Sequence, residues 1–153
     1  MVRLSDFDTA EQDYFVRTEC PSFETTPWTT PKPLPQARVA IVSTAALQRR
    51  GEQPFYSGAT HYGVIPGDVA AKDLLMSHSS VNFDRTGFQQ DHNIAFPIDR
   101  LKEMATEGAI GGVADFHYTV YGGTPPEKLE PAAREIAGLL KRDAVDIALL
   151  VPV

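Results

Sequence analysis

The stretch from Pro125 to Val153 constrains the fold more than any other part of the chain, because it joins an amphipathic segment to an apolar run. In "PPEKLEPAAREIAGLLKRD", the apolar side chains recur at helical spacing on one broad face, and most charged side chains lie elsewhere. That face carries Leu129, Ala132, Ala133, Ile136, Leu139 and Leu140. The run "AVDIALLVPV" follows directly and predicts a buried strand. A helix leading into such a strand is the crossover unit of an α/β sheet, and it is expected to be right-handed.

Two further segments predict the rest of a parallel sheet. The run "ARVAIVST", residues 37–44, is β-branched without strict alternation, which is typical of a strand covered on both faces. "PIDRLKEMATEG" has apolar residues at helical spacing and ends at Gly108, which suits a helix C-terminus. A strand is predicted from about Val113 to Tyr121, where two glycines close it. The expected fold class is therefore α/β, a three-layer Rossmann-like or flavodoxin-like domain with a mostly parallel sheet.

The first 35 residues differ in character from the rest. Within residues 1–35, "PSFETTPWTTPKPLP" carries five prolines and predicts an extended arm that follows a short N-terminal segment. Phe23 and Trp28 give the arm apolar anchors, which would pin it across the domain or against a second subunit of a homo-oligomer. Residues 36–153 are predicted to form the α/β domain, a normal length for one core.

Composition excludes several classes of partner. The net charge is -6 and the Lys and Arg residues do not cluster, which argues against binding to nucleic acid. The sequence contains no apolar stretch of roughly 20 residues and its N-terminus is acidic, so neither a membrane span nor a signal peptide is predicted and a cytoplasmic location is expected. Cys20 is the only cysteine, so it predicts no intramolecular disulfide, and we assign it no chemistry.

The middle of the chain is irregular and rich in polar side chains that suit a site on shaped loops. A metal site could be drawn from imidazole and carboxylate groups there, although their spacing matches no metal-binding motif. Those groups are His78, Asp84, Asp91, His92 and His117. Serine chemistry is also conceivable at Ser77 to Ser80, but no Gly-x-Ser-x-Gly turn supports it.

The stretch "DHNIAFPIDRL" has two interpretations. Its Pro97 and Asp99 suit a helix N-terminus, which favours negative charge nearby. Asp91, Asn93 and Arg100 could therefore belong to a polar substrate pocket. Alternatively, Asp91 and Asn93 organise the loop, and Arg100 pairs with a local acid.

The order of the motifs resembles the selenoprotein B family of the glycine, sarcosine, betaine and D-proline reductases. The likeness runs from about Trp28 to Val153 and includes "IPGDV", "LLMSHSSVNFD" and "VDIALLVPV". Its most specific part is the pattern D-x-N-x-x-F-P-x-D-R-L-x-x-x-x-x-E-G-x-I-G, matched from Asp91 to Gly111. The chain is most similar to the short, D-proline-reductase-like members.

The resemblance implies a catalytic residue that this sequence does not contain. In the family, the strand equivalent to "ALLVPV" is followed at once by selenocysteine or cysteine, then two residues and a second cysteine. We therefore expect the nucleophile just after Val153, so that the chain is the truncated N-terminal portion of a selenoprotein ended at a UGA codon. No cofactor is expected in this chain itself. The resemblance implies a pyruvoyl group on a partner subunit that activates the substrate, and a thiol electron donor.

The sequence also departs from the family pattern. The usual paired glycines after the first strand are Ala45 and Ala46 here. The Arg often found before "IP" is absent, because Gly63 and Val64 precede this motif. Both departures fall near the expected ligand crevice, so the substrate is not fixed by the resemblance.

The leading hypothesis is the scaffold and substrate-pocket portion of a selenoprotein B-type reductase component, an oxidoreductase that is inactive as the 153-residue chain alone. It would act in the reductive cleavage of a small amine or amino-acid-like substrate. The candidate pocket residues are His78, Asp91, Asn93, Arg100 and His117. His78 or His117 would transfer a proton, and Asp91 with Asn93 would orient the substrate. The alternatives are a non-catalytic α/β module that binds a ligand or partner, and a His/Asp metal-dependent hydrolase.

Overall fold

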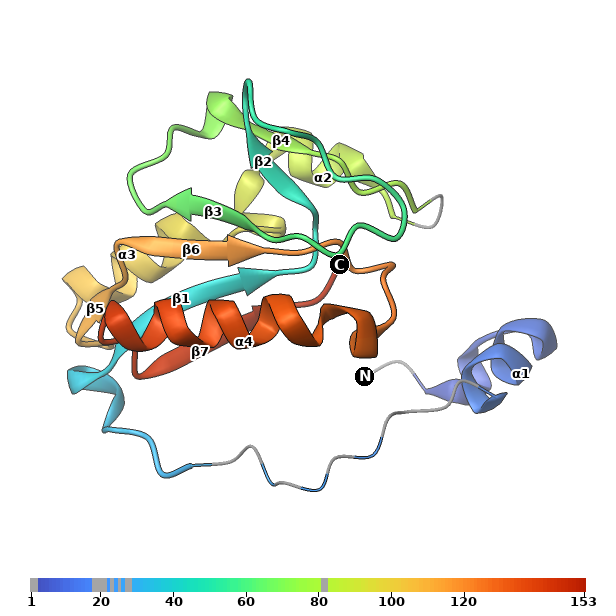
Figure 1. The fold of residues 1–153 in the computed structure, drawn as a ribbon, viewed down its shortest axis with the longest axis horizontal. Helices are drawn as coiled ribbons and strands as arrows, with labels where there is room; N and C mark the ends of the chain where they lie inside the picture. Colours follow the sequence, from blue (N-terminus) through green and yellow to red (C-terminus); the bar gives the residue numbers. More distant parts are fainter. Residues whose placement is uncertain (1–2, 18–21, 23, 25, 27–28, 81–82) are drawn as a thin grey trace.

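The computed structural model describes residues 3–17, 22, 24, 26, 29–80 and 83–153 (Figure 1). The predicted anchors Phe23 and Trp28, and also Cys20, lie outside the described residues. The N-terminal part contains a 3-10 helix, η1 (Leu4–Asp6), and the helix α1 (Thr9–Arg17). A third short element, η2 (Leu34–Gln36), leads into the sheet.

The main sheet is centred on the predicted first strand, β1 (Arg38–Ser43). On one side β1 pairs in parallel with β7 (Ile147–Val151). On the other side it pairs in parallel with β5 (Gly112–Val113) and β6 (Phe116–Thr119). The strand β3 (Gly63–Pro66) is antiparallel to β6. The prediction of an α/β fold with a mostly parallel sheet is thus confirmed.

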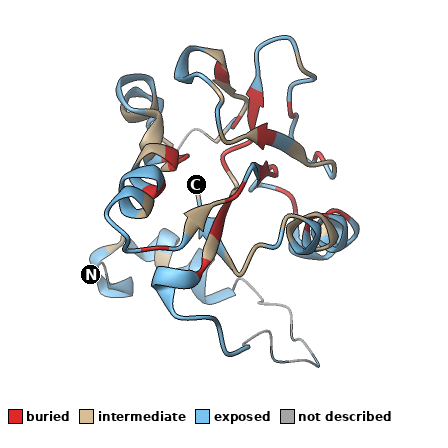
Figure 2. Cartoon of the chain, turned by 90° about the vertical axis from the view of Figure 1, so that its left-hand side faces the viewer, coloured by how far each residue is buried: buried red, intermediate tan, exposed pale blue. Residues whose placement is uncertain are grey.

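Two helices predicted from periodicity cover the two faces of the sheet (Figure 1). The helix α4 (Pro126–Arg142) packs Ile136 against Tyr118 and Val120. The helix α3 (Ile98–Thr106) packs Ile98 and Leu101 on the opposite face. Figure 2 shows the buried residues gathered along the strands between the helices. Successive residues of β1 point to opposite faces, so Ile41 belongs to the α3 face and Val42 to the α4 face.

The predicted strand from Val113 to Tyr121 is interrupted at residues 114–115, which separate β5 from β6. The reason lies in His117, whose Nδ1 accepts the backbone N–H of Ile41 at 2.9 Å. A side chain therefore replaces a backbone carbonyl at this point of the sheet, and the backbone of the second strand bulges away to make room for it.

The irregular middle of the chain contains short elements that were not predicted. The strands β2 (Leu47–Arg49) and β4 (Leu74–Met76) form a separate antiparallel pair. Between and after them lie η3 (Ala71–Asp73), α2 (Arg85–Gln90) and η4 (His92–Ile94). Elements of three to six residues are too short to show a hydrophobic period. Among the described residues, no helix is long and apolar enough to cross a bilayer.

The predicted burial of the last strand is wrong for part of its length. Leu149 is 37% exposed and Leu150 is 70% exposed. The cause is position: β7 pairs with β1 along one edge, and within the described residues no strand pairs with its other edge. The helix α4 packs on residues of β1 and β6, so it leaves the outer strand partly uncovered.

Candidate functional site

The carboxyl ends of β1, β6 and β7 meet at one edge of the sheet, where open α/β sheets bind their ligands. Thr44 follows β1 and ties this edge to the last residues of the chain. Its Oγ1 accepts the N–H of Val153 at 2.8 Å and lies 3.3 Å from the Val153 carbonyl oxygen. Its backbone N–H donates to the carbonyl of Val151 at 3.0 Å. The main chain at Val153 is therefore held in place by a hydroxyl group.

His78 lies over the same edge, on the loop that follows β4. Its side chain is buried, and Nδ1 accepts the N–H of Ser80 at 3.3 Å. The ring stacks on Tyr121, with 5.8 Å between centroids and 24° between planes. Phe83 meets the ring edge-on at 5.7 Å. Because Nδ1 is an acceptor, the proton of the neutral ring is on Nε2.

The surroundings of His78 favour the neutral ring. Burial lowers the pKa of His78, and the positive charge of Arg85 acts in the same direction. A hydrogen bond with the backbone of Val153 has the opposite effect and raises the pKa. This last interaction places the imidazole directly beside the main chain at the end of β7.

Polar contacts fix the loop that carries His78. The hydroxyl groups of Ser79 and Tyr121 are hydrogen-bonded to each other, and the guanidinium of Arg85 donates to the carbonyl of His78. Tyr121 itself is buried and forms an isolated bridge with Ala45. The position of the imidazole is thus fixed by contacts within its own loop, with Tyr121 just after β6 and with Arg85 of α2.

Asp91 and Asn93 form a second polar group, at the start of α3. Asp91 accepts the backbone N–H of Asn93 at 2.9 Å and its side-chain amide at 2.8 Å. The side-chain amide oxygen of Asn93 accepts the N–H of Asp99 at 3.0 Å, which satisfies a backbone donor in the first turn of α3. The imidazole of His92 lies 3.3 Å from the Asp99 carboxylate. These hydrogen bonds are those of a loop that organises a helix start.

Arg100 lies near the group of Asp91 and Asn93 and not near His78. It pairs with Glu103 at 2.8 Å on the exposed side of α3. Hydrogen bonds from Asn93 lower the pKa of Asp91, and the charges of His92 and Arg100 contribute less. The structure therefore brings Asp91, Asn93 and Arg100 into one neighbourhood.

His117 stands apart from both groups, inside the sheet. It is fully buried, and its Nδ1 is occupied by Ile41. Its Nε2 has no hydrogen-bond partner among the described residues. Within the same residues, no hydrogen bond or ion pair links His78 to any of the other four candidates. The five predicted residues thus occupy three places.

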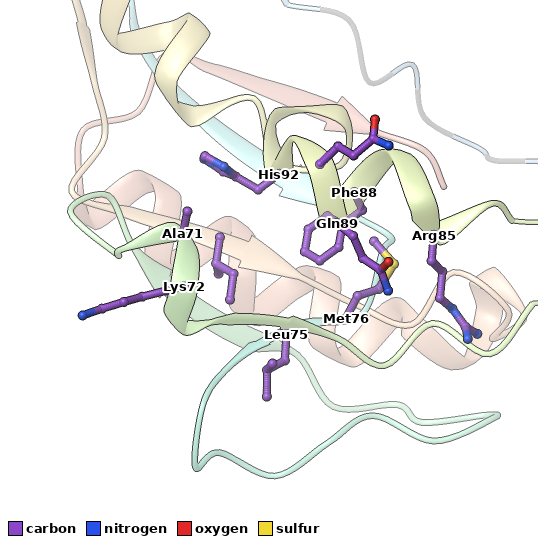
Figure 3. Close-up of a pocket in the computed structure, with 10 residues that line it drawn as sticks. Ala71, Lys72, Leu75, Met76, Arg85, Phe88, Gln89 and His92 are labelled. Atoms are coloured by element: carbon purple, nitrogen blue, oxygen red, sulfur yellow. The ribbon is translucent and has the colours of Figure 1, made fainter.

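The cavity in Figure 3, of about 500 Å³, lies between β4, α2 and η4. Its wall includes Met76, Arg85, Phe88 and His92, but none of the groups at the strand ends. It adjoins the His78 loop through Arg85, whose guanidinium reaches the His78 carbonyl. We therefore place the candidate site at the strand ends, where the hydrogen bonds converge, and regard the cavity as its neighbour.

The metal interpretation finds no support in the geometry. In the part of the chain that the structure describes, no three His, Cys, Asp or Glu side chains come together as metal ligands would. The candidates His78, Asp91 and His117 are in separate places, and Asp84 instead caps α2 by accepting the N–H of Thr86 at 2.8 Å.

Sequence reasoning missed two residues of the site. Tyr121 was treated only as the end of a predicted strand, although that position alone puts it at the ligand edge. Arg85 was not considered, because it lies seven residues from His78 on an element too short to be predicted. Thr44 ends the run predicted as the first strand, and its contact with Val153 is made across 109 residues, which no local pattern indicates.

Comparison with known proteins adds independent information. Residues 9–152 match the family "Glycine/sarcosine/betaine reductase selenoprotein B". The D-proline reductase subunit gamma of Acetoanaerobium sticklandii is 34% identical over 122 residues, which cover 78% of this chain and 50% of that protein. A glycine reductase complex component B subunit gamma of Symbiobacterium thermophilum is 31% identical over 147 residues, covering 91% of this chain and 34% of that subunit.

A betaine reductase complex component B subunit beta of Peptoclostridium acidaminophilum is 28% identical over 120 residues, covering 75% of this chain and 28% of that subunit. The chain thus spans half of the length of one of these relatives and about a third or less of the other two. No solved structure matches the chain significantly.

Proposed function

Because the chain belongs to the glycine/sarcosine/betaine reductase selenoprotein B family, we propose that it forms the scaffold and part of the substrate pocket of a component B-type reductase. The reaction is the reductive cleavage of a small amine or amino-acid-like substrate. The nucleophile is a selenocysteine or cysteine in the position that follows Val153. The observation that carries this proposal is the convergence of Thr44 and His78 on the main chain at Val153.

The position suits a selenolate or thiolate. A residue just past the carboxyl end of a parallel strand lies at the ligand edge of the sheet. Here the imidazole of His78 carries its proton on Nε2, beside the Val153 backbone. We propose that this N–H, which meets the Val153 backbone in the 153-residue chain, donates instead to the nucleophile once that residue follows Val153, and so keeps it oriented.

The proposed proton transfer to the leaving amine is compatible with the lowered pKa of His78 only when the nucleophile is present. A negative charge next to the ring favours its protonated form and so raises the pKa again. As the nucleophile attacks the substrate carbon and forms a carbon–selenium or carbon–sulfur bond, the carbon–nitrogen bond breaks, and the proton passes from the ring to the leaving nitrogen. The buried His117, whose Nδ1 is engaged by Ile41, is less suited to this role.

The family resemblance implies a pyruvoyl group on a partner subunit, and the curated relatives are named as subunits of reductase complexes. When present, such a group supplies an electrophilic carbonyl that binds the substrate amine. A group carried by another subunit must reach the end of β7 from outside. The exposure of Pro152 and the partial exposure of Val153 are compatible with this requirement.

The experiment starts from the gene. We expect the triplet after the Val153 codon to be UGA, followed in frame by a further cysteine codon. The extended protein, produced with selenocysteine or with cysteine at that position, is assayed with its pyruvoyl-containing partner and a dithiol donor. D-proline, glycine, sarcosine and betaine are the substrates to test first. Turnover is expected for the extended protein and not for the 153-residue chain.

Two matched variants test the role of His78. His78→Phe keeps a ring against Tyr121 but removes the N–H, and it should lower turnover about 100-fold or more. His61→Phe is the control, because His61 is a half-buried imidazole that also stacks on an aromatic ring, that of Phe55 at 4.5 Å, away from the strand ends. Reductive turnover by the 153-residue chain alone, or a stop codon other than UGA, would overturn the proposal. Equal turnover in both variants would remove His78 from it.

A further inference from the structure

The outer edge of β7 is open in the described part of the chain, and its backbone groups are suited to pair with another strand. In a parallel ladder, alternate residues direct both N–H and C=O to the same side. The carbonyl of Val151 accepts the N–H of Thr44, so Val151 faces β1. By alternation, the N–H and C=O groups of Ala148 and Leu150 point to the open side. An apolar strand with a free edge of this kind is a template for strand addition.

The side chains of β7 also lack cover on one face in particular. Leu150 lies in register with Val42 of β1, so both residues are on the α4 face. Val42 packs into the cluster beneath α4, whereas Leu150 is 70% exposed. On the opposite face Leu149 is only 37% exposed. The strand β7 is therefore uncovered mainly on the face of the sheet on which α4 packs, because α4 covers β1 and β6 and does not reach Leu150.

The order of the strands specifies what could supply that cover. From β6 the chain crosses over β1 on the α4 face and enters β7, while the connection from β1 to β6 steps the other way and includes α3. Right-handed crossovers that step in the same direction lie on the same face of a sheet. A next crossover that stepped outward from β7 would therefore place its helix beside α4, directly over Leu150.

We propose that β7 is an internal strand of a larger sheet, and that its open edge receives a parallel strand from the segment encoded after Val153. The helix of that crossover packs on the α4 face and covers Leu150. This inference rests on the proposed function, which places further polypeptide after Val153. It is supported by the length of the relatives, since this chain covers 50% of one and 34% of another.

The sheet would then have the strand order of a doubly wound fold. Neighbouring strands β1 and β7 would send their connections in opposite directions, which makes the space between their carboxyl ends a topological switch point. Thr44 and Val153 meet at that point. The same event that completes the sheet would therefore also close the crevice in which the candidate site lies.

The test is amide hydrogen exchange at Ala148 and Leu150, measured in the 153-residue chain and in the extended protein with cysteine after Val153. We expect these two amides to exchange on the order of 100-fold more slowly in the extended protein. A second measurement uses Leu150→Lys, which should leave the unfolding midpoint of the short chain unchanged but lower that of the extended protein. Val64→Lys is the matched control, because Val64 is 37% exposed on the antiparallel strand β3.

Equal exchange in the two proteins would overturn the inference, as would a gene with no open frame after Val153. Protection that appears in the short chain and grows with its concentration would also overturn it, because a second copy would then occupy the edge. The outcome of the exchange experiment can be distinguished from the outcome of the turnover assay. An extended protein that is protected but inactive contradicts the proposed function alone, and one that is active but unprotected contradicts this inference alone.

Discussion

Acid should destabilise this protein through the buried imidazole of His117. The ring is fully buried, and its Nδ1 accepts the N–H of Ile41 at 2.9 Å. Protonation would put a hydrogen on Nδ1, so that two donors would face each other in the middle of the sheet. Burial lowers the pKa of His117 to about 4, and the charge of Asp143 only partly opposes this shift. The native sheet therefore requires the neutral ring.

The direction and size of the effect follow from the difference between the folded and unfolded pKa values. An unfolded histidine titrates near 6.5, so below that pH the unfolded state takes up the proton first. Stability is then highest above pH 6.5 and declines as the pH falls toward the folded value. A folded pKa of about 4 corresponds to a loss of about 2 kcal/mol at pH 5 and about 3 kcal/mol at pH 4.

Urea unfolding of three proteins between about pH 7.5 and about pH 5 measures this contribution. His117→Asn keeps an acceptor near the position of Nδ1 and does not titrate. Its free energy of unfolding should therefore change by about 2 kcal/mol less over this range than that of the wild type. His117→Leu should be equally insensitive but less stable by about 1–3 kcal/mol throughout, because Ile41 loses its partner. His78, whose pKa burial also lowers, is present in all three proteins and cancels. Equal pH dependence in wild type and His117→Asn would refute the reasoning.

Three further predictions concern the same framework. Ala144 is exposed, follows the end of α4 and has a φ of 51°, so Ala144→Gly should stabilise the protein by up to about 1 kcal/mol. Ala133 is exposed within the helix, so Ala133→Gly should destabilise the protein by about 1 kcal/mol. A change of the same sign in both variants in urea unfolding would contradict this. Asp143→Ala should cost about 1.5–3 kcal/mol at neutral pH, because Asp143 accepts hydrogen bonds from Arg38 and from two backbone N–H groups. Because Arg38 and these donors outweigh burial and lower the pKa of Asp143, that cost should shrink as the pH falls below about 4, and a cost that stays constant would argue against the ion pair. Thr44→Val should speed amide exchange at Val153 about 10-fold without changing global unfolding by more than about 1 kcal/mol, and unchanged exchange would exclude Thr44 as the residue that holds this end of the chain.

The sequence predicted secondary structure best where a hydrophobic pattern extends over many consecutive residues. The helix of α4 and the strand β7 follow from periodicity over residues 125–153, and both are present. The family pattern has glycines where this sequence has Ala45 and Ala46, and the backbone at the second of these positions shows why a glycine suits it. Ala46 adopts a φ of 52°, a left-handed conformation that suits the glycine expected from the family pattern.

What could not be predicted depends on partners that are distant in the sequence. His117 looked like a candidate for chemistry, yet its Nδ1 serves an N–H group 76 residues away, which no local pattern records. Leu150 was predicted to be buried because it is apolar, but burial also requires a neighbour, and the described residues do not provide one. Asp91 and Asn93 fit both interpretations of their stretch, and their hydrogen bonds are those of the loop-organising one.

The position of β1 also has a consequence for how the protein is made. Its parallel partner β7 comes late in the chain, and Arg38 is hydrogen-bonded to Asp146, 108 residues further on. At a synthesis rate of about 5–20 residues per second, roughly 5–20 s separate the two strands on the ribosome. Both edges of β1 are unpaired until β5 and β6 have been translated, and the edge that β7 covers stays unpaired for the whole interval, which exposes the nascent chain to aggregation. Slow folding dominated by non-local pairing is therefore expected, and so is a need for a chaperone to shield β1 until the later strands have been translated.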